Sequence, residues 1–315
     1  MVKPMIMQMG SYPVWDEAAL NDSYDVRRYF EAPDKAAFLA QNGAGIRAIA
    51  TRGELGASRA VIEACPQLEL ISVFGVGYDA VDLAACRDHG IRVTNTPDVL
   101  TDDVADLAVA MLLAVARGLI GAEDWVRSGD WARGGDYPLQ RRVWGQRAGI
   151  LGLGRIGQAV VRRLHGFGME VSYCATAAKA GAEGMRFVAD PVALARDVDF
   201  LFVTLAASDK TRHIVGQEVI AALGPEGILI NVSRGSNVDE GALLAALESG
   251  GLGAAALDVF DNEPAIDPQF LSLRNVLLQP HHGSATVATR KAMGQLVRDN
   301  LAAHFTGKPL LTPVL

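Results

Sequence analysis

The sequence predicts two doubly wound α/β domains, each built on a parallel sheet. Three observations lead to this fold class. Short apolar segments alternate with helical ones along nearly the whole chain, an order that implies parallel strands joined by right-handed crossovers. A strand, a glycine-rich turn and an amphipathic helix follow one another at residues 149–164. The length of 315 residues is enough for two domains, each with its own core.

The composition agrees with a soluble, cytoplasmic enzyme. The formal net charge of −7 argues against nucleic-acid or anionic-membrane partners. The three cysteines are odd in number and lack metal-type spacing, so we expect reduced thiols, no metal site and a cytoplasmic location. The N-terminus lacks a signal-peptide layout. The longest apolar stretch, 104–116, is interrupted by Asp106 and is too short to span a bilayer.

The first 99 residues are expected to form a small α/β unit. Its strands are predicted at 5–9, 24–30, 46–51, 70–74 and 91–95, with helical stretches such as 33–41, 58–64 and 79–88 between them. The fourth strand leads into a loop, 74–79, that contains two glycines. Backbone N–H groups in such a loop can converge on an anion, although from these residues alone a plain turn is the favoured interpretation.

A long helix is expected next. Thr101 is a suitable N-cap, and Asp102 and Asp103 stand in the first turn, where the helix dipole favours carboxylates. Apolar residues then recur at helical spacing up to Gly118, a possible stop. Residues 119–147 are interpreted as a long connection that carries four aromatic residues. A subunit interface is one explanation of it, and packing against its own domain is the other.

The stretch at 149–164 matches the dinucleotide fingerprint G-x-G-x-x-G in its required context of strand and helix. Gly152 permits the tight turn, Gly154 leaves room for a pyrophosphate, and Gly157 allows the helix to lie close to the strand. The helix N-terminus would then direct N–H groups at the phosphates. The second unit is therefore predicted to be a Rossmann-like domain that binds a dinucleotide.

The rest of the chain continues the alternation. Further strands are predicted at 170–174, 199–204, 227–232, 253–259 and 275–279, with helices such as 217–223 and 240–249 between them. The last helix, 284–305, is expected to return to the first unit, which otherwise lacks its final helix. Ligands of open parallel sheets bind at the carboxyl ends of the strands.

Three polar residues follow the ends of late strands: Arg234, Glu263 and His281. Arginine can grip carboxylate and carbonyl oxygens, and histidine can give a carbonyl oxygen its proton while a carboxylate orients it. This set suits hydride transfer at a keto acid. Each residue also has an ordinary explanation, as a surface ion pair, a turn residue or a loop histidine.

The chain resembles the D-isomer-specific 2-hydroxyacid dehydrogenases along nearly its whole length. The stretches that carry the resemblance are 95–101, 152–157, 231–235, 258–264 and 280–286.

The resemblance implies roles for the site residues. His281 would be the acid/base, Glu263 its partner, and Arg234 a catalytic and substrate-binding residue. Val76 and Gly77 would offer backbone N–H groups to the substrate carboxylate, which overturns the plain-turn interpretation of their loop. The cofactor-binding residues expected on these stretches are Gly152, Gly154, Arg155, Ile156, Gly157, Val232 and Asp258, of which Asp258 would hold the nicotinamide carboxamide.

The resemblance also implies an arrangement of domains. A split substrate domain, 1–99 plus 285–315, would surround a dinucleotide-binding domain at 100–284, with an active-site cleft between them. A homodimer would form through 100–147. The substrate would be a small 2-keto acid, with glyoxylate and hydroxypyruvate first and 2-ketogluconate as an alternative. A dinucleotide-sensing interaction module of the same fold is the alternative from another class.

Two positions depart from many relatives. His282 stands where an aliphatic residue is frequent, so a second imidazole lies next to the acid/base. Residues 204–207 replace a proline-containing loop beside the cofactor.

The absence of an acidic residue after the second strand of this domain bears on the choice between NAD and NADP. No Asp or Glu stands between the strand that ends at Cys174 and Glu183, whereas an NAD site places one there to bind the ribose 2′-OH. We therefore expect NADP(H) to be preferred and NAD(H) to be possible. Thr176 is a candidate donor to the 2′-phosphate, and Lys179 and Arg155 are the nearest candidate cations. The alternative is a permissive loop that takes both cofactors.

Overall fold

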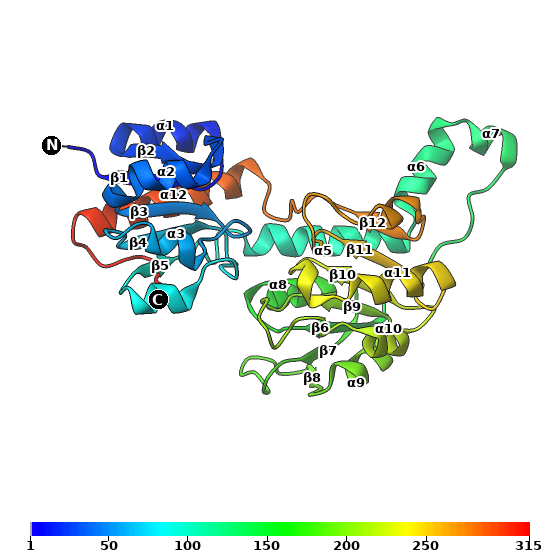
Figure 1. The fold of residues 1–315 in the computed structure, drawn as a ribbon. Coiled ribbons are helices and arrows are strands. Elements are labelled where there is room, and N and C mark those ends of the chain that lie inside the picture. The colour runs from blue at the N-terminus through cyan, green and yellow to red at the C-terminus, as the bar shows by residue number, and fades with distance from the viewer. Residues whose placement is uncertain (1) are drawn as a thin grey trace. The chain divides into compact units, whose positions relative to one another are not determined.

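The computed structural model describes residues 2–315, and the chain divides into two compact units (Figure 1). Unit 1 takes in the chain up to Leu100 together with Ser284–Leu315, and unit 2 is Thr101–Gly283. Each unit has a parallel sheet with helices on its faces. The predicted fold class, two parallel-sheet α/β domains, is confirmed.

The sheet of unit 1 has five parallel strands in the order β2-β1-β3-β4-β5. They are β1 (Met5–Gln8), β2 (Asp25–Arg28), β3 (Ala48–Arg52), β4 (Leu70–Phe74) and β5 (Arg92–Thr94). Every residue of β4 is buried, because helices cover both faces of a parallel sheet. The covering helices are α1 (Val14–Ser23), α2 (Lys35–Asn42), α3 (Arg59–Glu63), α4 (Leu83–Asp88) and α12 (Val287–Phe305).

Two elements of unit 1 differ from the sequence prediction. Helix α1 was not predicted, because its ten residues bury only Asp16 and Leu20 and carry no clear apolar stripe. The second strand ends at Arg28 rather than residue 30, and a 3₁₀ turn, η1 (Tyr29–Glu31), follows it. The apolar residues of this segment pack from a turn, and the sequence pattern cannot distinguish such a turn from the end of a strand.

The end of the chain completes unit 1. Helix α12 packs on β4 and α1, and Val314 donates its N–H to the Val93 carbonyl across 2.8 Å. Thr312 donates its hydroxyl to the Asn95 carbonyl across 2.6 Å. Residues about 220 apart in sequence therefore close the edge of this sheet beside β5.

The sheet of unit 2 has seven parallel strands in the order β12-β11-β10-β9-β6-β7-β8. They are β6 (Arg147–Leu151), β7 (Glu170–Cys174), β8 (Arg186–Phe187), β9 (Phe200–Val203), β10 (Ile228–Asn231), β11 (Ala254–Leu257) and β12 (Val276–Leu278). The strand order reverses between β6 and β9. Such a switch point is where open α/β sheets bind their ligands.

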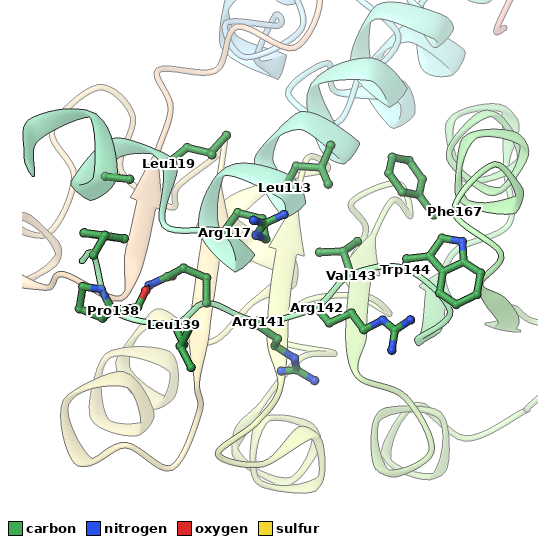
Figure 2. Close-up of a pocket in the computed structure, with 13 residues that line it drawn as sticks. Leu113, Arg117, Leu119, Pro138, Leu139, Arg141, Arg142, Val143, Trp144 and Phe167 are labelled. Carbon is green, nitrogen blue, oxygen red and sulfur yellow. The ribbon is translucent and has the colours of Figure 1, made fainter. Parts of the chain in front are cut away.

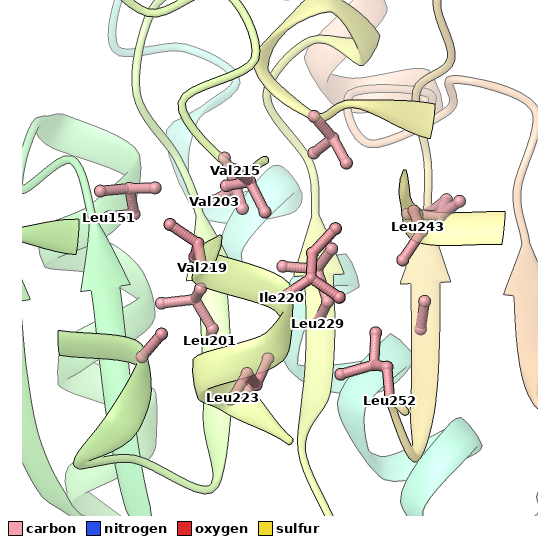
Figure 3. Close-up of a cluster of buried hydrophobic side chains, with 14 of the residues drawn as sticks. Leu151, Leu201, Val203, Val215, Val219, Ile220, Leu223, Leu229, Leu243 and Leu252 are labelled. Atoms are coloured by element: carbon pink, nitrogen blue, oxygen red, sulfur yellow. The ribbon is translucent and has the colours of Figure 1, made fainter. Parts of the chain in front are cut away.

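Helices cover both faces of this sheet. They are α5 (Thr101–Ala116), α8 (Arg155–His165), α9 (Pro191–Arg196), α10 (Gln217–Leu223) and α11 (Glu240–Ser249). Side chains from α9, α10 and α11 join Leu151, Leu201 and Leu229 in one buried cluster (Figure 3). Helices α5 and α8 pack on each other, and Ile150 lies next to Gly157 of α8. This packing holds the strand ends, and the loops that follow them, in fixed positions.

The structure corrects the interpretation of residues 119–147 as one long connection. This segment contains two helices, α6 (Leu119–Arg127) and α7 (Asp130–Gly134). Both begin after a glycine in the left-handed conformation, Gly118 and Gly129, and neither has a buried residue. Helix prediction from sequence relies on one buried apolar stripe. These two helices were missed because they combine glycines and charged residues with apolar side chains that are exposed.

Among residues 2–315, no single helix is long and apolar enough to cross a membrane. Helices α5 and α6 reach that length and composition only as a pair, which bends by 58° at its break.

Candidate active site

The glycine turn after β6 has the geometry that a dinucleotide requires. Gly152 has φ +102°, and a Cβ there would lie 2.6 Å from the Leu205 backbone. A Cβ at Gly157 would lie 2.4 Å from the Gly152 carbonyl oxygen. A Cβ at Gly154 would instead meet no atom within 4 Å. Packing therefore requires glycine at positions 152 and 157. Gly154 instead leaves open space at the N-terminus of α8, where a pyrophosphate fits.

The residues expected to select the cofactor lie beside this turn. Arg155 and Ile156 are the first residues of α8, and Thr176 and Lys179 are exposed after β7. The backbone N–H of Lys179 donates to the hydroxyl of buried Tyr173 across 2.9 Å, which ties the loop to the strand.

Arg234 follows β10 in a loop that is held by its neighbours. The Asn231 side chain accepts from the Ser233 N–H and donates to the Arg234 carbonyl, each across 3.0 Å. A Cβ at Gly235 would lie 2.0 Å from the carbonyl carbon of Phe260. The glycine therefore lets the loop after β10 touch the segment after β11. Arg234 is half-buried, and its charge acts on Glu263.

Glu263 and His281 form a hydrogen-bonded pair. His281 Nδ1 lies 2.6 Å from Glu263 Oε2, and the other carboxylate oxygen accepts the Phe260 N–H across 2.8 Å. The side chains keep 25% and 34% of their exposure, respectively. With Nδ1 bound to the carboxylate, Nε2 is left to exchange a proton with a substrate.

The environment keeps Glu263 ionised. Burial alone would raise the pKa of its carboxyl group. The hydrogen bond and charge of His281, the Phe260 N–H and the charge of Arg234 outweigh burial, so that the pKa lies below its usual range. The pair therefore presents a carboxylate to the imidazole of His281.

Asp258 holds the loop that carries His281. The residue is 2% exposed, and its two carboxylate oxygens accept the N–H groups of His282 and Gly283 across 2.8 and 2.9 Å. Burial raises the pKa of Asp258, and these two N–H groups only partly oppose it. Val232, the other expected cofactor residue at this edge, is buried directly after β10.

The predicted carboxylate-binding loop lies in unit 1. Asn95 donates its side-chain amide to the Val76 carbonyl across 2.9 Å, and the Gly75 N–H donates to the Thr96 hydroxyl across 3.0 Å. Within residues 2–315, the N–H groups of Val76 and Gly77 donate to no other residue. They are thus available to an anion.

Unit 2 brings together Arg234, Glu263 and His281, while Val76 and Gly77 belong to the other unit. Sequence reasoning missed two contributors, the Phe260 N–H that holds Glu263 and the Gln279 side chain that contacts His282. A backbone donor leaves no trace in the residue type. Gln279 ends the last apolar run, and that polar position was the available signal.

Two hollows open on unit 2. One, of about 290 Å³, borders Glu263 and His281 and is otherwise mostly apolar, with Phe260, Ile266 and Leu278 in its wall. The other, of about 710 Å³, lies between α5, α6 and residues 137–144 (Figure 2).

Residues 109–283 match the family model described as D-isomer specific 2-hydroxyacid dehydrogenase, NAD binding domain. The chain is 46% identical to hydroxyphenylpyruvate reductase of Plectranthus scutellarioides, over 98% of both chains.

Two solved structures have nearly the same fold as this chain. A 2-hydroxyacid dehydrogenase from Ketogulonicigenium vulgare Y25 superposes with a TM-score of 0.94 at 69% identity, covering 100% of this chain and 99% of that one. An NADPH-dependent glyoxylate/hydroxypyruvate reductase from Sinorhizobium meliloti, solved with NADP and malonate, gives 0.93 at 42% identity, covering 99% and 97%.

Proposed function

The chain belongs to the D-isomer specific 2-hydroxyacid dehydrogenases, and from this we propose that it reduces a small 2-keto acid to the D-2-hydroxy acid with NADPH. The observation that carries the proposal is the His281–Glu263 pair, 2.6 Å between Nδ1 and Oε2. It lies at the carboxyl edge of the sheet that also bears the glycine turn. An oriented acid and a dinucleotide turn on one edge are what carbonyl reduction requires.

Each side chain has a defined part in this reaction. When it is bound, the reduced nicotinamide supplies a hydride to the carbonyl carbon. His281 donates its Nε2 proton to the carbonyl oxygen, and Glu263 orients the imidazole and stabilises its protonated form. Arg234 binds the substrate oxygens through its guanidinium and stabilises charge that develops on them.

The proposed substrates are glyoxylate and hydroxypyruvate, the pair named for the Sinorhizobium meliloti relative. The apolar pocket beside His281 and the hydroxyphenylpyruvate reductase relative are reasons to test an aromatic keto acid as well. The deciding experiment measures kcat/KM for glyoxylate, hydroxypyruvate, 2-ketogluconate and hydroxyphenylpyruvate with NADPH and with NADH. Absence of turnover with all four acids would contradict the proposal.

NADPH is the proposed cofactor because the loop after β7, where an NAD site places an acid, contains no Asp or Glu before Glu183. The loop after β7 offers Thr176 and Lys179, both exposed, and Arg155 begins the neighbouring helix. A carboxylate there would repel a 2′-phosphate, and its absence removes that repulsion. NADH remains a usable donor in this proposal, with a lower kcat/KM.

We further propose that unit 1 is the substrate domain and unit 2 the dinucleotide-binding domain. Gly152, Gly154, Ile156 and Gly157, with Val232 and Asp258, are the proposed cofactor-binding residues of unit 2. Val76 and Gly77 are the proposed carboxylate-binding residues of unit 1, because their N–H groups have no partner among residues 2–315. Exchange of Gly77 for proline, which removes one donor, should raise KM for the keto acid more than it lowers kcat.

A homodimer through residues 100–147 is proposed on the exposure of that segment. Leu119, Ile120 and Trp131 keep 50%, 61% and 61% of their surface exposed, and apolar exposure of this kind marks an interface. Light scattering should give a dimer for the unmodified protein and a monomer for Leu119→Asp/Ile120→Asp. Val287→Asp, an equally exposed position in unit 1, should remain dimeric. A monomeric unmodified protein would contradict the proposal.

We also propose a cytoplasmic location. All three cysteines are free and buried, a state that agrees with a reducing compartment.

A further inference from the structure

His281 has an unusual backbone conformation. Its φ is +52°, in the left-handed region, and the other non-glycine residues of this kind among residues 2–315 are Asp98 and His213. A side chain disfavours this region because its Cβ approaches the following carbonyl oxygen. Such a residue keeps its conformation only where its surroundings hold it. The acid/base of the proposed reaction therefore depends on contacts beyond its own imidazole.

The first of these contacts is the Asp258 carboxylate. It accepts the two backbone N–H groups that come directly after His281, those of His282 and Gly283. A Cβ at Gly283 would lie 3.1 Å from Asp258 Oδ2 and 3.3 Å from Val104, so glycine allows this approach. The chain is thus held immediately after the left-handed residue.

A second contact closes the loop across His281. His282 Nε2 lies 2.8 Å from Gln279 Oε1, a bond that spans Pro280 and His281. Because the Gln279 amide nitrogen donates to the Leu278 carbonyl across 2.8 Å, its oxygen is the acceptor and the proton is on His282 Nε2.

The Gln279 end of this bond is itself anchored. Its backbone N–H donates to the Leu257 carbonyl across 2.8 Å, and Leu257 immediately precedes Asp258. Glu263 is also held near this point, through the N–H of Phe260. Both members of the acid/base pair are therefore anchored near the end of β11. Glu263 is anchored through the Phe260 N–H, and His281 is anchored through the Gln279–His282 bond.

We propose that Gln279 and His282 form a side-chain clasp that, together with Asp258, holds His281 in its left-handed conformation and so places its imidazole for proton transfer. The inference rests on the proposed function for its catalytic consequence. Gln279 and His282 are positioning residues in this account and touch no reacting atom.

The test removes the clasp and follows three quantities. His282→Phe deletes the donor and keeps the backbone N–H to Asp258, and Gln279→Leu deletes the acceptor. Since a misplaced catalytic group costs rate, each variant should lower kcat by about ten-fold. The Kd of NADPH, measured by tryptophan fluorescence, should stay unchanged. The double variant should lose no more than either single variant, because the two residues act through one bond.

A conservative variant and a control complete the series. His282→Gln keeps an N–H donor near the position of Nε2 and should restore most of kcat. His165→Phe replaces an exposed histidine on α8 of the same unit and should leave kcat and the NADPH Kd unchanged. If His282→Phe does not fold, Gln279→Leu carries the same test.

A readout independent of turnover separates this inference from the proposed function. In the cofactor-free protein labelled with ¹⁵N-histidine, the N–H proton between His281 and Glu263 should give a downfield NMR signal. That signal should shift upfield or broaden in His282→Phe and remain in His165→Phe. An unmodified protein without keto-acid turnover would refute the function and leave this readout to decide the clasp.

Three results would overturn the clasp. The first is an unchanged NMR signal in both His282→Phe and Gln279→Leu. The second is unchanged kcat in these variants. The third is a loss of kcat matched by an equal loss of NADPH affinity, which would indicate a general structural role.

Discussion

Replacement of Glu263 by glutamine tests the charge that faces His281. The amide keeps the shape and one hydrogen-bond acceptor, so the variant removes the negative charge 2.6 Å from Nδ1 with little change in packing. Keto-acid reduction needs the protonated imidazole. Without the carboxylate that form is less stable, and the basic limb of the pH profile of reduction should move to lower pH.

The size of the movement follows from the strength of the contact. A hydrogen bond to a charged group contributes about 1.5–3 kcal/mol, and 1.36 kcal/mol corresponds to one pH unit, which gives roughly one to two units. The two side chains keep 25% and 34% of their exposure. Water screens a partly exposed pair, so the lower end, about one unit, is expected.

The assay is kcat/KM for hydroxypyruvate with saturating NADPH, measured across the pH range where both proteins stay folded. Glu240→Gln is the matched control, because Glu240 is a half-buried neighbour that accepts the Asp261 N–H and, among residues 2–315, forms no hydrogen bond or ion pair with His281. Its limb should coincide with that of the unmodified protein. A Glu263→Gln limb that also coincides would refute the role of the carboxylate.

Four further outcomes are expected. His281→Ala should lower kcat by roughly a hundred-fold or more with NADPH binding intact, and near-normal turnover would exclude it as the acid. Lys179→Ala should reduce the ratio of kcat/KM for NADPH to that for NADH, whereas an unchanged ratio would free the residue of this role. Gly154→Ala should keep the melting temperature of the unmodified protein in calorimetry and bind NADPH more weakly in a titration. Gly157→Ala should lose about 1–3 kcal/mol of unfolding free energy, measured by calorimetry. The Glu263 pKa is lowered on folding, so the stability that its charge contributes should be fully present above the ordinary carboxyl pKa and be lost as pH falls from there through the lowered pKa of the folded state. Denaturation of the unmodified protein and of Glu263→Gln at several pH values would measure this loss.

The strands and the loops after them were largely predictable from the sequence. Both faces of each sheet are covered, so β9 is a continuous apolar run and β4 is interrupted only by Ser72. A residue that follows such a run lies at the carboxyl edge of the sheet. The sequence therefore predicted that Arg234 and His281 lie at this edge. Glu263 and His281 are 18 residues apart, yet they follow the adjacent strands β11 and β12, and adjacency made their contact predictable.

Other features depend on tertiary contacts that no local pattern contains. Helices α1 and α6 lack a buried stripe, so helical periodicity could not reveal them. The left-handed backbone of His281 is contrary to the preference of the residue and results from Asp258 and the Gln279–His282 bond. His282 stood out as a second imidazole, but its partner could be identified only from the bend of the loop.

The most direct test of the account follows the hydrogen atoms in one turnover. The unmodified protein is given hydroxypyruvate and NADPH that carries deuterium at both C4 positions, and the glycerate is examined by mass spectrometry and chiral chromatography. The account predicts D-glycerate with one deuterium at C2. Unlabelled product or L-glycerate would contradict it, and so would the absence of product with hydroxypyruvate and with each of the other three acids.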